Sequence, residues 1–120
     1  MDYKIKSRIW IEVGGKVLLG EGRVQLLKAI DATGSLSKAA KSLSMSYKKA
    51  WELLDAINKA GAALVVIKST GGKNGGGTVI TPYGKELITA YDSVNKNCWE
   101  YLDTQIPQFP NPKNVEIISE

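Results

Sequence analysis

The order of hydrophobic patterns along the 120 residues predicts a mainly α-helical fold with small β elements. Three observations support this prediction. Residues 21–60 contain three successive segments whose apolar residues recur at helical spacing. A short hairpin pattern lies on each side of them, and each includes a glycine-containing turn. A last helical pattern starts at Pro82 and runs to about Gln105.

The first element is expected to be a β-hairpin over residues 4–19. Ile5, Ile9 and Ile11 alternate imperfectly with charged residues. Gly14-Gly15 then supplies the positive φ angles that a tight two-residue turn requires. The hairpin is therefore predicted to turn at this glycine pair.

Three helices should follow, each with its own start or stop signal. Residues 21–33 form the first, which Gly34 ends. Ser35 caps a short second helix over residues 36–43, and Ser46 caps a third over residues 47–60. The residues predicted to face the core are Val24, Leu27, Ile30, Leu36, Ala39, Ala40, Leu43, Ala50, Leu54 and Ile57.

Two strands and a long helix follow. Residues 64–69 (LVVIKS) and the TVI segment at 78–80 form a second hairpin, with GGKNGGG (71–77) as its long tip. Thr81 caps the last helix, and Pro82 takes its first position, where proline is well tolerated. Prolines from residue 107 onward end that helix, and residues 114–119 form a tail or a short strand.

Composition excludes several classes of chemistry. The chain has no histidine and one cysteine, so a histidine-dependent triad is impossible and a zinc site is not expected. We expect no metal, no cofactor and no enzymatic activity. The lone Cys98 suits a reducing cytoplasm, and we expect neither a signal peptide nor a membrane span.

The order helix, short helix, tight turn, helix, hairpin describes a winged helix-turn-helix. Two helices that cross steeply over a short turn need small residues at the crossing, which Ala39 and Ala40 supply. In this fold the second helix enters the major groove of DNA with its N-terminal residues facing the bases. Here those residues are Ser46, Tyr47, Lys48 and Lys49. Their hydroxyl and ammonium groups suit bases and phosphates, and a formal net charge of +4 suits a polyanion.

Other interpretations of these residues stay open. Residues 35–60 alone fit an ordinary helical hairpin with a solvated lysine face equally well. The glycine-rich hairpin after them favours DNA binding, with Lys73 at its tip and Lys38 on the short helix as further contacts. For the tip the alternative is a solvent loop, whereas a nucleotide-binding loop would need a Gly-Lys-Ser/Thr ending. We expect Trp51 to be a packing residue, although it lies one position beyond the inner stripe of the third helix, which consists of Ala50, Leu54 and Ile57.

The last helix carries an apolar seam with spacings of 4, 3, 4 and 3 residues, as in a coiled coil: Leu87, Tyr91, Val94, Cys98 and Tyr101. A domain this small has little core left to cover so much aromatic surface, so we expect a helix-to-helix dimer contact. Part of the helix must also pack on its own domain. We expect Cys98 to be a small buried apolar residue rather than a reactive thiol.

Two stretches, SLSKAAKSLSMSYKKAWELLDAINK (35–59) and TGGKNGGGTVITPYGKELI (70–88), resemble the DNA-binding half of the molybdate-responsive ModE regulators. The resemblance covers roughly residues 20–105, and SYKKAW and TGGKNGGG are its most specific pieces. LysR-type regulators share the helix-turn-helix but lack this glycine-rich segment. The resemblance implies a dimeric regulator on an inverted-repeat operator, with residues 46–49 at the major groove and Lys73 in the wing.

Full-length ModE proteins also carry a C-terminal pair of molybdate-binding domains, and the sequence stops before them. We therefore do not expect this chain to bind molybdate itself, while a role at molybdenum-related genes stays open. Our domain assignment is a winged helix-turn-helix over residues 1–106, including a dimerisation helix at 82–105, and a proline-rich tail over 107–120. The main hypothesis is a homodimeric transcription regulator that binds double-stranded DNA in the cytoplasm. The alternative is a winged-helix docking or dimerisation module without its own operator.

Overall fold

The computed structural model describes residues 3–69, 77–116 and 118. These residues contain four helices and two antiparallel hairpins. Their order is β1 (Trp10–Val13), β2 (Lys16–Gly20), α1 (Glu21–Thr33), α2 (Leu36–Ser42), α3 (Tyr47–Ala60), β3 (Val66–Ser69), β4 (Gly77–Ile80) and α4 (Pro82–Gln105). Two 3-10 turns follow, Ile106–Gln108 and Pro112–Asn114. The predicted fold class, mainly α-helical with small β elements, is confirmed.

The helices begin and end at the predicted signals. Gly34 ends α1 with a φ of 68°, and its N–H donates to the Ile30 carbonyl at 2.7 Å. The hydroxyl oxygens of Ser35, Ser46 and Thr81 each accept the backbone N–H three residues later, at 3.0–3.1 Å. All three predicted N-caps are therefore confirmed.

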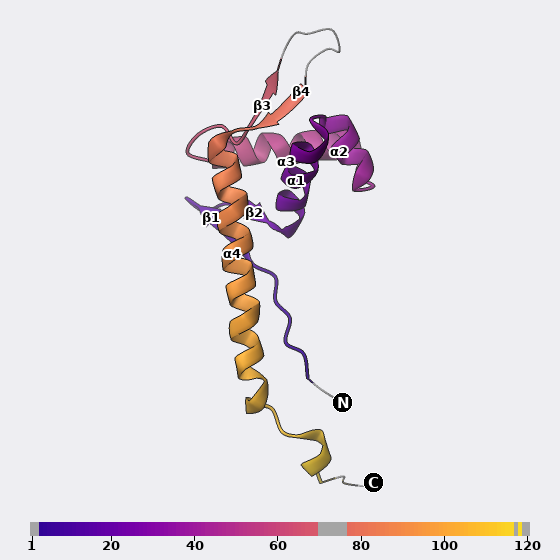
Figure 1. The fold of residues 1–120 in the computed structure, drawn as a ribbon, viewed down its shortest axis with the longest axis vertical. Coiled ribbons are helices and arrows are strands. Elements are labelled where there is room, and N and C mark those ends of the chain that lie inside the picture. The colour runs from indigo at the N-terminus through magenta and orange to yellow at the C-terminus, as the bar shows by residue number, and fades with distance from the viewer. Residues whose placement is uncertain (1–2, 70–76, 117, 119–120) are drawn as a thin grey trace.

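The first hairpin turns at Gly14 and Gly15, whose φ angles of 57° and 79° are both positive, as a tight turn requires. Its first strand starts at Trp10, so the predicted start at residue 4 was wrong. Strand β2 ends at Gly20, opposite Trp10, and residues before Trp10 have no strand to pair with. Residues 3–9 instead run beside α4 without regular secondary structure (Figure 1).

The core lies between the first three helices and the two hairpins. Its largest fully buried side chains are Leu19, Leu26, Leu27, Ile30, Ile57 and Val65. Nine of the ten positions predicted to face the core are buried, and the tenth, Leu43, is partly buried and packs against them. The spacing of apolar residues was therefore sufficient to orient α1, α2 and α3.

Helix α4 extends well beyond this core (Figure 1). Near its start, Tyr83, Leu87 and Ile88 pack against the core, and the molecule measures 71 × 28 × 23 Å because the rest of the helix projects away. The described part of the tail contains a 3-10 turn and no strand. Within the described ranges no helix combines the length and apolar character that a bilayer crossing requires.

Candidate nucleic-acid interface

The N-terminal end of α3 is exposed and carries no acidic residue in its first turn. Tyr47 is 52% exposed, and Ser46, Lys48 and Lys49 are exposed beside it. The Ser46 hydroxyl oxygen accepts the Lys49 N–H and so fixes where the helix starts. A helix N-terminus also carries a partial positive charge that attracts anions. This end of α3 therefore combines cationic and hydrogen-bonding groups that suit a phosphate-bearing partner.

The turn between α2 and α3 holds this end in place. The Met45 N–H donates to the Ala40 carbonyl at 2.9 Å, and Ser44 takes a positive φ of 53°. Ala39, Ala40 and Ala50 are buried, as expected for small residues where helices cross closely. Helix α2 thus packs against the buried side of α3 and leaves the first turn of α3 open to solvent.

Helix α2 carries further exposed lysines, and the acidic residues of α3 lie beyond its first turn. Lys38 and Lys41 are exposed on α2. Asp55 is half-buried, and its Oδ2 lies 2.8 Å from Lys59 Nζ, which offsets its charge. Glu52 is exposed. The balance of charge at the first turn of α3 is therefore positive.

The second hairpin, formed by β3 and β4 and called the wing below, is tied to α3 by Asn58. The side-chain oxygen of Asn58 accepts the N–H groups of Val65 and Val66 at 2.8 and 3.0 Å. Its Nδ2 donates to the Val66 carbonyl at 2.9 Å. At the other strand, the Thr78 N–H donates to the Gly34 carbonyl at 2.9 Å. These bonds fix the base of the wing against α3 and the end of α1 (Figure 1).

Of the six predicted DNA-contact residues, Ser46, Tyr47, Lys48 and Lys49 lie together at the start of α3, and Lys38 is exposed on the neighbouring helix α2. The sixth, Lys73, and the glycine tip at 70–76 lie outside the described residues. Strands β3 and β4 pair antiparallel from Val66 opposite Ile80 to Ser69 opposite Gly77.

Two residues of α3 have positions that the sequence did not predict. Trp51 is 43% exposed, so the prediction that it is a packing residue was wrong. Ala50, Leu54 and Ile57 already fill the contact with the core, and Trp51 is rotated by about 100° from Ala50. The sequence did contain a signal for this exposure, because Trp51 lies outside the inner stripe. The sequence contained no signal for the role of Asn58, because nothing in the spacing shows that its amide reaches β3.

The structure divides the apolar seam of α4. Leu87 and Tyr91 pack against the protein's own core. Cys98 is only half-buried, less than predicted, and its Sγ lies 3.6 Å from the Ser7 hydroxyl oxygen. Val94 and Tyr101 are 50% and 62% exposed. Part of the seam therefore serves the fold, and part stays open on the projecting half of the helix.

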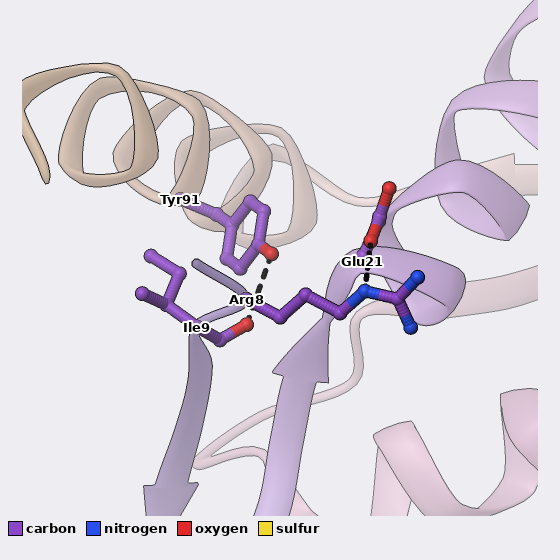
Figure 2. Close-up of polar contacts among 4 residues, drawn as sticks. All are labelled: Arg8, Ile9, Glu21 and Tyr91. Carbon is purple, nitrogen blue, oxygen red and sulfur yellow. Dashed lines mark hydrogen bonds and ion pairs between the residues drawn. The ribbon is translucent and has the colours of Figure 1, made fainter. Parts of the chain in front are cut away.

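Figure 2 shows how Tyr91 holds the N-terminal segment against α4: its hydroxyl donates to the Ile9 carbonyl at 3.1 Å. The adjacent Arg8 lies 3.7 Å from the Glu21 carboxylate at the start of α1. Burial raises the pKa of Tyr91 above its ordinary value of 10.0, and the carboxylates of Glu21 and Asp92 raise it further, against an opposing effect of Lys28. The phenol therefore keeps its proton at neutral pH and continues to donate this bond.

Among the residues that the structure describes, no three cysteine, aspartate or glutamate side chains are grouped to hold a metal ion. The groups gathered at the start of α3 are ammonium, hydroxyl and phenol groups. Such groups can bind a partner by charge and hydrogen bonding, as the phosphate and base contacts of nucleic-acid interfaces do.

Comparison with known proteins gives a consistent result. No family model matches the chain. It is 50% identical over 86 residues to the molybdenum-pterin-binding protein MopB of Rhodobacter capsulatus, and 46% identical over 74 residues to the transcriptional regulator ModE of Haemophilus influenzae. It is 43% identical over 77 residues to the DNA-binding transcriptional dual regulator ModE of Escherichia coli. None of these three names describes an enzyme.

These matches cover 72%, 62% and 64% of this chain, but 32%, 29% and 29% of the three relatives. The chain therefore spans about a third of the length of the curated relatives it matches.

Proposed function

Because this chain is a homologue of the ModE regulators over most of its own length, we propose that it is a DNA-binding transcription regulator that acts in the cytoplasm. The observation that carries the proposal is the exposed, cationic first turn of α3, held beside the wing by Asn58. Such an arrangement lets a helix enter the major groove while the hairpin contacts the neighbouring backbone.

In the proposed complex, the residues at the start of α3 have different roles. Lys48 and Lys49 neutralise phosphates, and Lys38 adds a phosphate contact from α2. Ser46 and Tyr47 face base edges, where hydroxyl groups both donate and accept hydrogen bonds. Lys73 supplies a further contact from the wing. Most of the affinity then comes from the lysines, and the choice of sequence comes from the residues that face the bases.

We further propose that the regulator is a homodimer on an inverted-repeat operator. The exposed Val94 and Tyr101 support this, because they extend the α4 seam beyond the part that the protein's own core covers. The proposed dimer interface also includes the less exposed residues of the seam, which are Leu87, Tyr91 and Cys98. Two α3 helices would then enter successive major grooves about 34 Å apart. The names of the relatives suggest target genes connected with molybdenum.

A second candidate is a docking or dimerisation module that has no operator of its own. The exposed apolar residues outside α3 favour it, with Trp10 on the first hairpin 59% exposed. Such surfaces commonly mark sites of protein–protein contact.

Duplex binding measured by fluorescence anisotropy distinguishes the two candidates. A pool of random duplexes is first enriched for sequences that the full chain retains, and binding is then measured at two salt concentrations. We expect binding that weakens steeply as salt rises, because each neutralised phosphate releases counterions. No binding to any duplex at low salt would favour the docking module.

A further inference from the structure

We propose that Trp51 determines specificity by placing its indole against the apolar surface of a nucleotide in the major groove, a role that rests on the DNA-binding function proposed above. The sequence pattern assigned Trp51 to packing, and the structure leaves it open on the same helix as the predicted base-facing residues. The inference adds an apolar contact to an interface otherwise made of charged and hydroxyl groups.

The position of Trp51 on α3 supports this role. Successive helical residues are about 100° apart, so Tyr47, Trp51 and Asn58 lie on one side of the helix. The three hydrogen bonds of the Asn58 amide show that this side faces β3. Tyr47 and Trp51 are also one turn apart and are both well exposed. The indole therefore stands between the cationic first turn and the base of the wing, where a duplex held by both would pass.

The surroundings of Trp51 also suit an apolar contact with DNA. Among the described residues the Trp51 indole N–H has no hydrogen-bond acceptor, whereas the Trp10 indole donates to Glu12 at 2.7 Å. Asp55, the acidic residue one turn further along this side of α3, is paired with Lys59. Glu52 points about 100° away from Trp51. The methyl group of thymine and the deoxyribose ring both offer apolar surface to a helix in the major groove.

Fluorescence of a chain with Trp51 as its only tryptophan tests the contact directly. Trp10 and Trp99 are both exposed, and the W10F/W99F variant removes them with little expected effect on folding. We expect the enriched duplex to shift the Trp51 emission and to protect it from a soluble quencher. Tight binding with unchanged emission and quenching would overturn the contact proposed for Trp51 and leave the proposed DNA-binding function standing. Failure of the wild-type chain to bind any duplex would overturn the proposed function as well.

Substitutions then test the chemistry of the contact. We expect W51A to weaken binding to the enriched duplex about tenfold and W51F to retain most of the affinity, since an aromatic ring still fills the site. The control W10A removes an indole on the first hairpin and should leave affinity unchanged. Equal losses in W51F and W51A would overturn the apolar contact. Duplexes with deoxyuridine in place of thymidine identify the group that Trp51 contacts. If this replacement weakens binding by the wild type but not by W51A, the contact is with the thymine methyl group. If it leaves the affinity of the wild type unchanged, the contact is with the deoxyribose.

Discussion

Lys48 and Lys49 are adjacent in sequence, yet they point in directions about 100° apart on α3 and need not contact the same phosphate. We expect Lys48→Ala and Lys49→Ala each to weaken duplex binding. The slope of log affinity against log salt should fall by about 0.9 for each phosphate that is no longer neutralised. Anisotropy titrations across a series of salt concentrations measure this slope.

Lys16 provides the matched control, because it is an exposed lysine on the first hairpin and belongs to neither α2, α3 nor the wing. Lys16→Ala should leave both the affinity and the slope as they are in the wild type. A slope unchanged in both α3 variants would remove these lysines from the phosphate interface.

Tyr91 contributes to stability through a bond that only its protonated form can donate. We expect Tyr91→Phe to lower the free energy of unfolding by about 1 kcal/mol at neutral pH, because the Ile9 carbonyl loses its donor. The pKa of Tyr91 is raised in the folded protein, so its contribution is complete below the ordinary value of 10.0 and is lost as pH rises through the folded pKa. The difference between wild type and variant should therefore narrow in alkaline solution.

Urea unfolding of both proteins at about pH 8 and about pH 10.5 measures that difference on each side of the transition. Tyr47→Phe, at an exposed position, should change the free energy of unfolding little at neutral pH. A gap between wild type and Tyr91→Phe that widens as pH rises would contradict the assignment.

At the scale of elements, the contact between α4 and the wing depends on a residue without a side chain. A Cβ atom at Gly84 would lie 2.5 Å from the Val65 carbonyl oxygen and 2.8 Å from a methyl group of Ile80. Backbone atoms cannot move away cheaply, so Gly84→Ala should destabilise the protein by about 1–3 kcal/mol. Chemical denaturation followed by circular dichroism gives the value.

Gly22 is the control for that substitution, because a Cβ atom there would meet nothing within 4 Å and the residue lies in helix α1. Gly22→Ala should be neutral or stabilise the protein by up to about 1 kcal/mol, through the lower entropy of the unfolded chain. Helical propensity favours alanine over glycine at both positions, so similar changes of stability in the two variants would contradict the close packing assigned to Gly84.

The elements themselves were largely predictable, because their signals are local. The serine and threonine caps, the glycine turn and the spacing of apolar residues each act over a few positions, and they located α1 to α4 within a residue or two. Residues 4–9 were misassigned because the segment is held by α4, where Tyr91, the partner of Ile9, is more than 80 residues away in sequence. The position of Trp51 was missed for a related reason: apolar character predicts burial, but the core beside α3 was already filled.

At the scale of the whole molecule, the projecting half of α4 predicts a dimer. We expect the wild-type protein to sediment as a dimer, and Val94→Lys or Tyr101→Lys to shift it toward monomer, because each places a charge in an apolar contact. Duplex affinity should fall with the loss of the second α3. Analytical ultracentrifugation measures the association.

Ser93→Lys adds the same charge at an exposed position about 100° around the helix from Val94, and should leave the dimer intact. Dimers that persist in both seam variants would contradict the proposed interface. The sequence alone left the division of the seam undetermined, since the same 4, 3, 4, 3 spacing serves packing within a chain and between chains.

The central claim is that the first turn of α3 and the wing beside it form one surface that binds duplex DNA. Amide chemical shifts of the ¹⁵N-labelled full chain, followed as the enriched duplex is added, test it most directly. We expect the largest changes at residues 46–51 and along β3 and β4, with the first hairpin little affected. Changes concentrated on α4 or the first hairpin, with residues 46–51 unperturbed, would contradict it.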